Sequence, residues 1–274
     1  MSRTFQMKAI VAAVSLLIGL SWNVQPAQAQ ADTITIAAAN SLKDALRKVL
    51  PLFEAEHRST TVRVIYGPSQ TLRSQIEQGA PVDIFLPSLF EEIDQLEAKG
   101  LIIQGTKRAF AATSLVLITG TTLPAPISSI QDLQTTPIRR IAVGDPKTSS
   151  VGKVAAQFLK FSKLEPKLKS QYILGEHSRA VLDLVAKGEA EIGVVYRTDA
   201  ISNSGVRILD TAPVGSHTPV RYGVAAAWTA QNISAAGDFI EFLLSPTIQT
   251  MLQEFGFDRV SPEVGFAQRE EVKP

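Results

Sequence analysis

Hydrophobic residues follow two alternating patterns along most of the chain. Short runs rich in Ile, Val and Ala are typical of buried β-strands, and each is followed by a segment with the apolar spacing of a helix. Three strand-like runs end at serines beside a predicted helix start. These are Ile34–Asn40 ending at Ser41, Thr61–Pro68 ending at Ser69, and Ile141–Pro146 continuing into the turn Lys147–Gly152.

The first part of the chain is predicted to alternate strands with helices. The strands are Thr33–Ala39, Thr61–Tyr66 and Val82–Leu86, and the helices are Leu42–Phe53, Gln70–Gln78 and one that runs from the capping box Ser88–Glu91 to Gly100. Ser41 and Ser69 are suited to cap the helices that follow them, and Pro51 is expected to kink or interrupt its helix.

Phe110–Thr119 is the most continuous strand-like run, and we expect it to cross into a second domain. That domain is predicted to hold the strands Ile138–Val143, Tyr172–Leu174, Glu191–Tyr196 and Val206–Leu209 and the helices Ser128–Leu133, Ser150–Phe161 and Arg179–Lys187. Thr218–Trp228 is expected to return to the first domain, where Ala235–Leu244 and a last helix beginning at Ser245-Pro246 follow.

This alternation predicts an α/β fold with mainly parallel sheets covered by helices on both faces. Ligands bind such sheets at the carboxyl ends of the strands, where Ser41, Ser69 and the Lys147–Gly152 turn are all expected. A helix start carries unpaired N–H groups and a partial positive charge, which suits an anion. Several helix starts facing one point would therefore hold an oxyanion without Lys or Arg.

The N-terminus and the composition suggest an exported protein. Residues 1–29 combine the basic Arg3 and Lys8, the apolar run Ala9–Leu20 and the site Ala27–Ala29, which together predict a cleaved signal peptide. About 245 residues remain, enough for one large or two small domains. The chain has no cysteine and a net charge of +1, so neither disulfides nor binding to nucleic acid is expected, and no later run suits membrane insertion.

Other chemistries find little support in the sequence. Gly152-Lys153 resembles part of a nucleotide P-loop, but Lys147 replaces its first glycine and Val154 its Mg²⁺-binding hydroxyl residue. The three histidines are not spaced for a structural metal site, and no serine-hydrolase elbow is present. Glu176 and His177 are interpreted as a solvated loop pair, because no nucleophile is predicted beside them.

Five segments, in this order and spacing, resemble the periplasmic molybdate-binding proteins of ABC importers. They are Ala37–Leu42, Ser69–Leu72, Gln75–Phe85, Ala142–Pro146 and Gly193–Tyr196, and the resemblance extends from about Ile34 to Phe257. It implies a type II periplasmic-binding-protein fold with two lobes and a ligand cleft between them. We expect lobe 1 at residues 31–112 and 223–270, lobe 2 at residues 113–222, and hinges near Ala111–Ser114 and Arg221–Val224.

The resemblance also implies a set of ligand-binding residues. Ser41 and Ser69 would donate through hydroxyl and backbone N–H groups, Val151 and Ser178 through their backbone N–H groups, and Tyr196 through its hydroxyl. Asn40 and Ser178 depart from residue types usual in the family, so Ser178 could add a hydroxyl donor. For each residue alone a plainer interpretation exists, with the serines as helix caps and the tyrosine as a core residue.

The expected function is capture of molybdate or tungstate, with no catalysis, no cofactor and molybdenum present only as the bound oxyanion. The expected partner is an inner-membrane ABC permease, the expected location the periplasm, and the expected state a monomer. A protonated oxyanion such as phosphate would need an acceptor, and the predicted site has no Asp or Glu, so phosphate is disfavoured. Sulfate, like molybdate, has no proton to donate, so a site made of donors alone would suit it equally. The alternatives are a receptor for sulfate or a small organic anion, and an exported enzyme using Asp145, Glu176 and His177.

Overall fold

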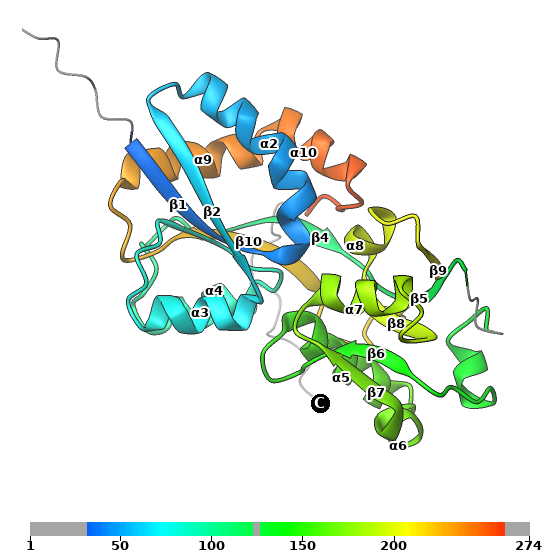
Figure 1. Ribbon diagram of the computed structural model, residues 1–274. Helices are drawn as coiled ribbons and strands as arrows, with labels where there is room; N and C mark the ends of the chain where they lie inside the picture. Colours follow the sequence, from blue (N-terminus) through cyan, green and yellow to red (C-terminus); the bar gives the residue numbers. More distant parts are fainter. Residues whose placement is uncertain (1–31, 123–126, 261–274) are drawn as a thin grey trace, which may run out of the picture. The chain divides into compact units, whose positions relative to one another are not determined.

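The computed structural model describes residues 32–122 and 127–260 (Figure 1), so the predicted signal peptide lies outside the described residues. The described chain contains two five-stranded sheets. In the first, the strand order is β2-β1-β3-β10-β4, formed by Thr60–Gly67, Asp32–Ala39, Ile84–Leu86, Val220–Ala226 and Arg108–Thr113. In the second, it is β7-β6-β8-β5-β9, formed by Tyr172–Gly175, Ile141–Gly144, Ile192–Tyr196, Leu115–Gly120 and Val206–Thr211.

Both sheets are mixed, which differs from the expected predominance of parallel pairing. In the first sheet β1 pairs in parallel with β2 and β3, while β10 is antiparallel to β3 and β4. In the second, β6 is parallel to β7 and β8, while β5 is antiparallel to β8 and β9. The parallel pairs come from strand–helix–strand units, whereas the antiparallel pairs involve the strands that carry the chain between the sheets.

The predicted crossing strand is two strands. β4 ends at Thr113 in the first sheet and β5 begins at Leu115 in the second, with Ser114 between them. The chain returns through residues 212–219, because β10 begins at Val220 and pairs only in the first sheet. Arg221 and Val224 thus lie within β10, whose register against β4 shifts between Tyr222 and Gly223.

Helices cover both faces of each sheet. In Figure 1, α2 (Lys43–Glu56), α9 (Ile233–Leu244) and α10 (Pro246–Glu254) lie on one side of the first sheet, and α3 (Ser69–Glu77) and α4 (Glu91–Glu97) on the other. The second sheet carries α5 (Ser150–Phe161), α6 (Glu165–Leu168), α7 (Ser178–Ala186) and α8 (Arg197–Ile201). Within the described ranges there are also short 3₁₀ turns at Asn40–Leu42, Gln131–Gln134 and Lys169–Gln171.

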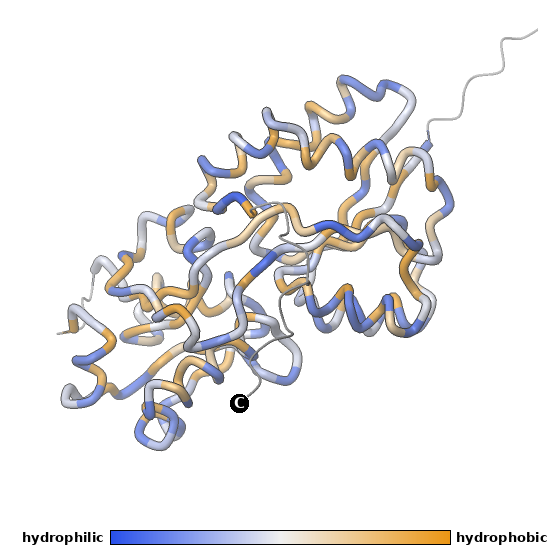
Figure 2. The backbone as a smooth tube through the Cα atoms, turned by 180° about the vertical axis from the view of Figure 1, so that it is seen from behind, coloured by the Kyte–Doolittle hydropathy of each residue, from blue (hydrophilic) through white to orange (hydrophobic). Residues whose placement is uncertain are grey.

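The alternation of side chains along β1 fixes this layering. Ile34, Ile36 and Ala38 pack into the larger core beneath α2 and α9, while Ala37 packs into a separate cluster with Leu72 and Ile76 of α3. Figure 2 shows hydrophobic and hydrophilic stretches alternating along the helices, as expected for helices that bury one face. Pro51 lies inside α2 without ending it.

Candidate functional site

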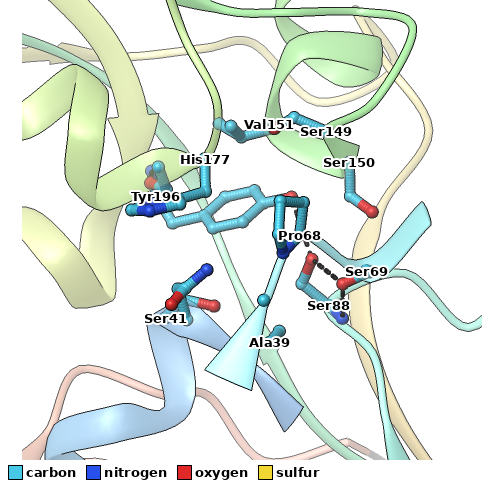
Figure 3. Close-up of a pocket in the computed structure, with 13 residues that line it drawn as sticks. Ala39, Ser41, Pro68, Ser69, Ser88, Ser149, Ser150, Val151, His177 and Tyr196 are labelled. Atoms are coloured by element: carbon cyan, nitrogen blue, oxygen red, sulfur yellow. Dashed lines mark hydrogen bonds between the residues drawn. The ribbon is translucent and has the colours of Figure 1, made fainter. Parts of the chain in front are cut away.

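All five residues predicted to bind a ligand line one small pocket (Figure 3). Its volume is about 20 Å³, which suits one small ion rather than an organic ligand. The described lining residues include no Lys, Arg, Asp or Glu. They are Ala39, Asn40, Ser41, Gly67, Pro68, Ser69, Ser88, Ser149, Ser150, Val151, His177, Ser178 and Tyr196.

The pocket lies where strand ends of both sheets meet helix starts. Asn40 and Ser41 follow β1, and Ser69 is the first residue of α3 just after β2. From the second sheet, Val151 is the second residue of α5 and Ser178 the first of α7. The first N–H groups of these helices have no intrahelical acceptor and carry the positive end of the helix dipole. The pocket therefore collects neutral donors from both halves of the chain.

Ser41 and Ser69 do not cap helices, so that part of the sequence-based interpretation is wrong. α2 begins after Leu42 and α3 after Pro68, and neither helix has a side-chain cap. The Ser41 hydroxyl instead accepts a hydrogen bond from the Tyr222 hydroxyl (2.9 Å). Because Tyr222 supplies that hydrogen, the hydrogen of Ser41 is left to point elsewhere.

Ser88 contributes to the site in a way that the sequence did not indicate. The predicted capping box is wrong, because α4 begins after Phe90 without a side-chain cap. The Ser88 N–H donates to Ser69 Oγ (3.1 Å), and Ser88 Oγ lies 3.2 Å from Ser69 Oγ and 3.4 Å from the Tyr196 hydroxyl. Because the Ser88 N–H is the donor to Ser69 Oγ, the Ser69 hydroxyl keeps its own hydrogen, which can be donated to Ser88 Oγ or into the pocket.

Tyr196 and Ser178 are held together at the end of β8. Tyr196 N–H donates to Ser178 Oγ (3.2 Å), so this hydroxyl oxygen has a structural partner. The Ser178 backbone N–H lies at the start of α7, has no intrahelical acceptor and is available to a ligand. Burial raises the pKa of Tyr196 well above its ordinary value. Its hydroxyl consequently keeps its proton and can serve as a hydrogen-bond donor near neutral pH.

A close backbone approach sets the position of the α5 start. Ser149 caps α5 by accepting from Gly152 N–H (3.4 Å). A Cβ on Gly152 would lie 2.4 Å from the carbonyl carbon and oxygen of Asp145, so only glycine lets α5 come this near the turn after β6. This contact explains why a glycine stands next to Val151.

His177 is a helix cap rather than a solvated loop residue. Its Nδ1 accepts from Ala180 N–H (3.1 Å) at the start of α7, and the ring lines the pocket. Burial is the main cause that lowers the pKa of His177, which favours the neutral ring that the cap requires. Glu176 is exposed, and the Asp145 carboxylate accepts from Lys147 N–H, so the groups of the enzyme alternative are engaged separately.

This cap predicts a pH effect on stability. Since the pKa of His177 is lower in the folded than in the unfolded protein, the unfolded chain takes up the proton first as pH falls below about 6.5. We expect His177→Asn, which keeps a capping acceptor but does not titrate, to lose less stability than wild type between pH 7.5 and 5. The excess loss in wild type is at most about 1.4 kcal/mol per pH unit. Calorimetric unfolding at both pH values measures it, and an equal loss in the two proteins would contradict this role.

Two ion pairs join the two halves of the chain. Arg179 of α7 pairs with Asp44 of α2, and Lys153 of α5 pairs with Glu91 of α4 (2.7 Å). Arg179 Nε also lies 3.3 Å from the carboxylate of Asp199, which is fully buried. Among the described residues no group of three or more His, Cys, Asp or Glu side chains could hold a metal ion, and no helix there is long and apolar enough to cross a bilayer.

The two mixed sheets, with a ligand-sized pocket where their strand ends meet, define the two-lobed type II fold of periplasmic binding proteins. The sequence model of bacterial extracellular solute-binding proteins matches residues 34–258. The chain belongs to this family.

Named relatives share most of their length with this chain. The molybdate-binding protein of Escherichia coli strain K12 is 31% identical over 238 residues, which cover 82% of this chain and 88% of the relative. The periplasmic molybdate-binding protein of Azotobacter vinelandii superposes with a TM-score of 0.74 at 19% identity, over 84% of this chain and all of that one. A sulfate-binding protein of Mycobacterium tuberculosis superposes with a TM-score of 0.71 at 20% identity, over 84% and 88%. The two superpositions show the fold alone.

Proposed function

We propose that this protein is the substrate-binding component of an ABC importer, and that it captures molybdate, and also tungstate, in the pocket between its two halves. The observation that carries the proposal is a pocket that hydroxyls and helix starts line, and whose lining among the described residues includes no carboxylate, ammonium or guanidinium group. Molybdate and tungstate are fully ionised tetrahedral dianions near neutral pH, so they need donors and no acceptor. The resemblance to named molybdate-binding relatives supports the choice of ligand.

The binding residues we propose are Ser41, Ser69 and Tyr196 through their hydroxyls, and Val151 and Ser178 through their backbone N–H groups. Hydrogen bonds to a charged group contribute about 1.5–3 kcal/mol each. After desolvation of the dianion and closure of the lobes, a net binding free energy of about 8–12 kcal/mol is reasonable, corresponding to micromolar to nanomolar Kd. No cofactor takes part, since the ion itself is the cargo.

Release to a membrane permease completes the proposed cycle. In this proposal lobe 1 holds the first sheet and lobe 2 the second. Because β4 ends at Thr113 and β10 begins at Val220, both in the first sheet, the lobes meet at Ser114 and within residues 212–219 rather than at the expected boundaries 112/113 and 222/223. The lobes would hinge where the chain passes between sheets, at Ser114 and residues 212–219. A monomer that acts in the periplasm after removal of residues 1–29 fits this cycle.

A panel of oxyanions tests the proposal. Because a ligand that binds only the folded protein stabilises it, molybdate and tungstate at 100 times Kd should each add about 2.7 kcal/mol and raise the Tm. Sulfate and phosphate at the same concentration should raise the Tm less. If sulfate raised the Tm as much as molybdate, the second candidate, a sulfate receptor, would be favoured. This candidate is considered because sulfate also needs only hydrogen-bond donors, and because a sulfate-binding protein shares the fold.

A further inference from the structure

The Ser150 side chain is a buried group without a partner. Ser150 is the first residue of α5, only 3% of its surface is exposed, and it lines the pocket. Its hydroxyl oxygen has no hydrogen-bond partner. Figure 3 shows this hydroxyl directed away from α5, toward the side of the pocket where Ser69 and Ser88 lie.

Helix capping does not account for this serine. The cap of α5 is Ser149, whose hydroxyl accepts from Gly152 N–H. The other serine hydroxyls of the predicted site have partners, since Ser41 accepts from Tyr222, Ser69 from Ser88 N–H, and Ser178 from Tyr196 N–H. Buried hydroxyls are almost always hydrogen-bonded in folded proteins, so a buried hydroxyl left unpartnered in a pocket points to a ligand that completes it.

We propose that Ser150 donates a hydrogen bond from its hydroxyl directly to the bound oxyanion. This inference rests on the proposed function and adds a residue to the ligand set. Two neighbouring residues of α5 would then contact the ion differently, with Val151 using its backbone N–H and Ser150 its side chain. A rotating hydroxyl can follow the oxygen of a tetrahedral dianion, and it brings no charge into a site that otherwise has none.

Titration calorimetry with sodium molybdate tests this contact in wild type, Ser150→Ala and a matched control. The control is Ser216→Ala, because Ser216 is also buried (4% exposed) with an unpartnered hydroxyl but does not line the pocket. Loss of one hydrogen bond to a charged ligand should raise the Kd of Ser150→Ala about 10- to 100-fold. The Kd of Ser216→Ala should stay within about twofold of wild type.

The Tm without ligand separates a binding role from a structural one. Removing an unpartnered buried hydroxyl should leave the Tm of Ser150→Ala equal to that of wild type or above it. A Tm lower by several degrees, or a Kd within twofold of wild type, would overturn the role of Ser150 and leave the proposed function intact. If wild type itself binds no oxyanion, the proposed function and this inference both fail.

Discussion

Replacement of Gly152 by alanine should be among the most damaging single changes in this protein. The added Cβ would lie 2.4 Å from the Asp145 carbonyl and 2.5 Å from the Gly144 carbonyl oxygen, and both contacts are with backbone that no side-chain rotation can relieve. Overpacking of this kind costs about 1–3 kcal/mol and occasionally more. We expect about 3 kcal/mol of lost stability, or a Tm lower by roughly 6–12 °C for a domain of this size.

Binding should fail together with stability in this variant, because the displaced α5 start carries the Val151 N–H group. The matched control is Gly237→Ala in α9, where a Cβ would meet no atom within 4 Å. There the alanine should raise stability by about 0.5–1 kcal/mol, because glycine is unfavourable inside a helix. Thermal unfolding of the two variants tests this prediction. Similar Tm values would contradict the claim that the backbone of Asp145 leaves no room for a Cβ at position 152.

Removal of the Arg179 charge should have the second large effect. Arg179 bridges Asp44 of the first half and Asp199 of the second, and the Asp199 carboxylate is fully buried. Burial, only partly offset by Ser178 and Arg179, raises the pKa of Asp199 to about 6. Breaking a buried pair from one side typically costs about 3–5 kcal/mol, and we expect that loss for Arg179→Met at pH 8.

The stability lost in Arg179→Met should depend on pH, because the charge of Asp199 does. The pKa of Asp199 is higher in the folded protein than its ordinary value of 3.8, so stability falls as pH rises between those values. Without Arg179 the pKa of Asp199 in the folded protein rises further, so the pH range over which stability falls extends toward pH 8. Arg179→Met should therefore be less damaging at pH 5 than at pH 8.

Two further variants isolate the cause of this effect. Asp199→Asn in the Arg179→Met background should restore much of the stability at pH 8, because it removes the unpaired buried charge. Lys153→Met removes the other ion pair between the halves, whose Glu91 partner is 41% exposed, and should cost less than about 1 kcal/mol. Equal losses for the two single variants, or no rescue by Asp199→Asn, would show that burial of Asp199 is not the source.

The sequence predicted the placement of the site better than its contacts. Ser41, Ser69 and Val151 follow strands that end at the same edges, so strand polarity alone brings them toward one place. The local sequence pattern gave wrong hydrogen-bond partners where a residue far away in the sequence binds the same side chain. The sequence pattern predicts Ser88 as a helix cap, but its hydroxyl lies within hydrogen-bond distance of Ser69 and Tyr196, which are 19 and 108 positions away.

The same limit explains two other differences between expectation and structure. The pairing of Ser41 with Tyr222 spans 181 positions, and no local motif signals it. The break at Ser114 does not appear in the hydrophobic pattern, because the buried residues Phe110 and Ala111 of β4 and the fully buried β5 form one continuous strand-like run. Periodicity identifies a buried strand but does not show which sheet it joins.

Crystals grown with sodium molybdate offer the most direct test of the central claim, because anomalous scattering locates molybdenum without reference to the protein. We predict one molybdenum atom in the pocket, with its oxygens about 2.7–3.1 Å from the hydroxyls of Ser41, Ser69 and Tyr196 and from the Val151 and Ser178 nitrogens. Molybdenum bound elsewhere, or held mainly by Lys or Arg side chains, would contradict a site built from neutral donors.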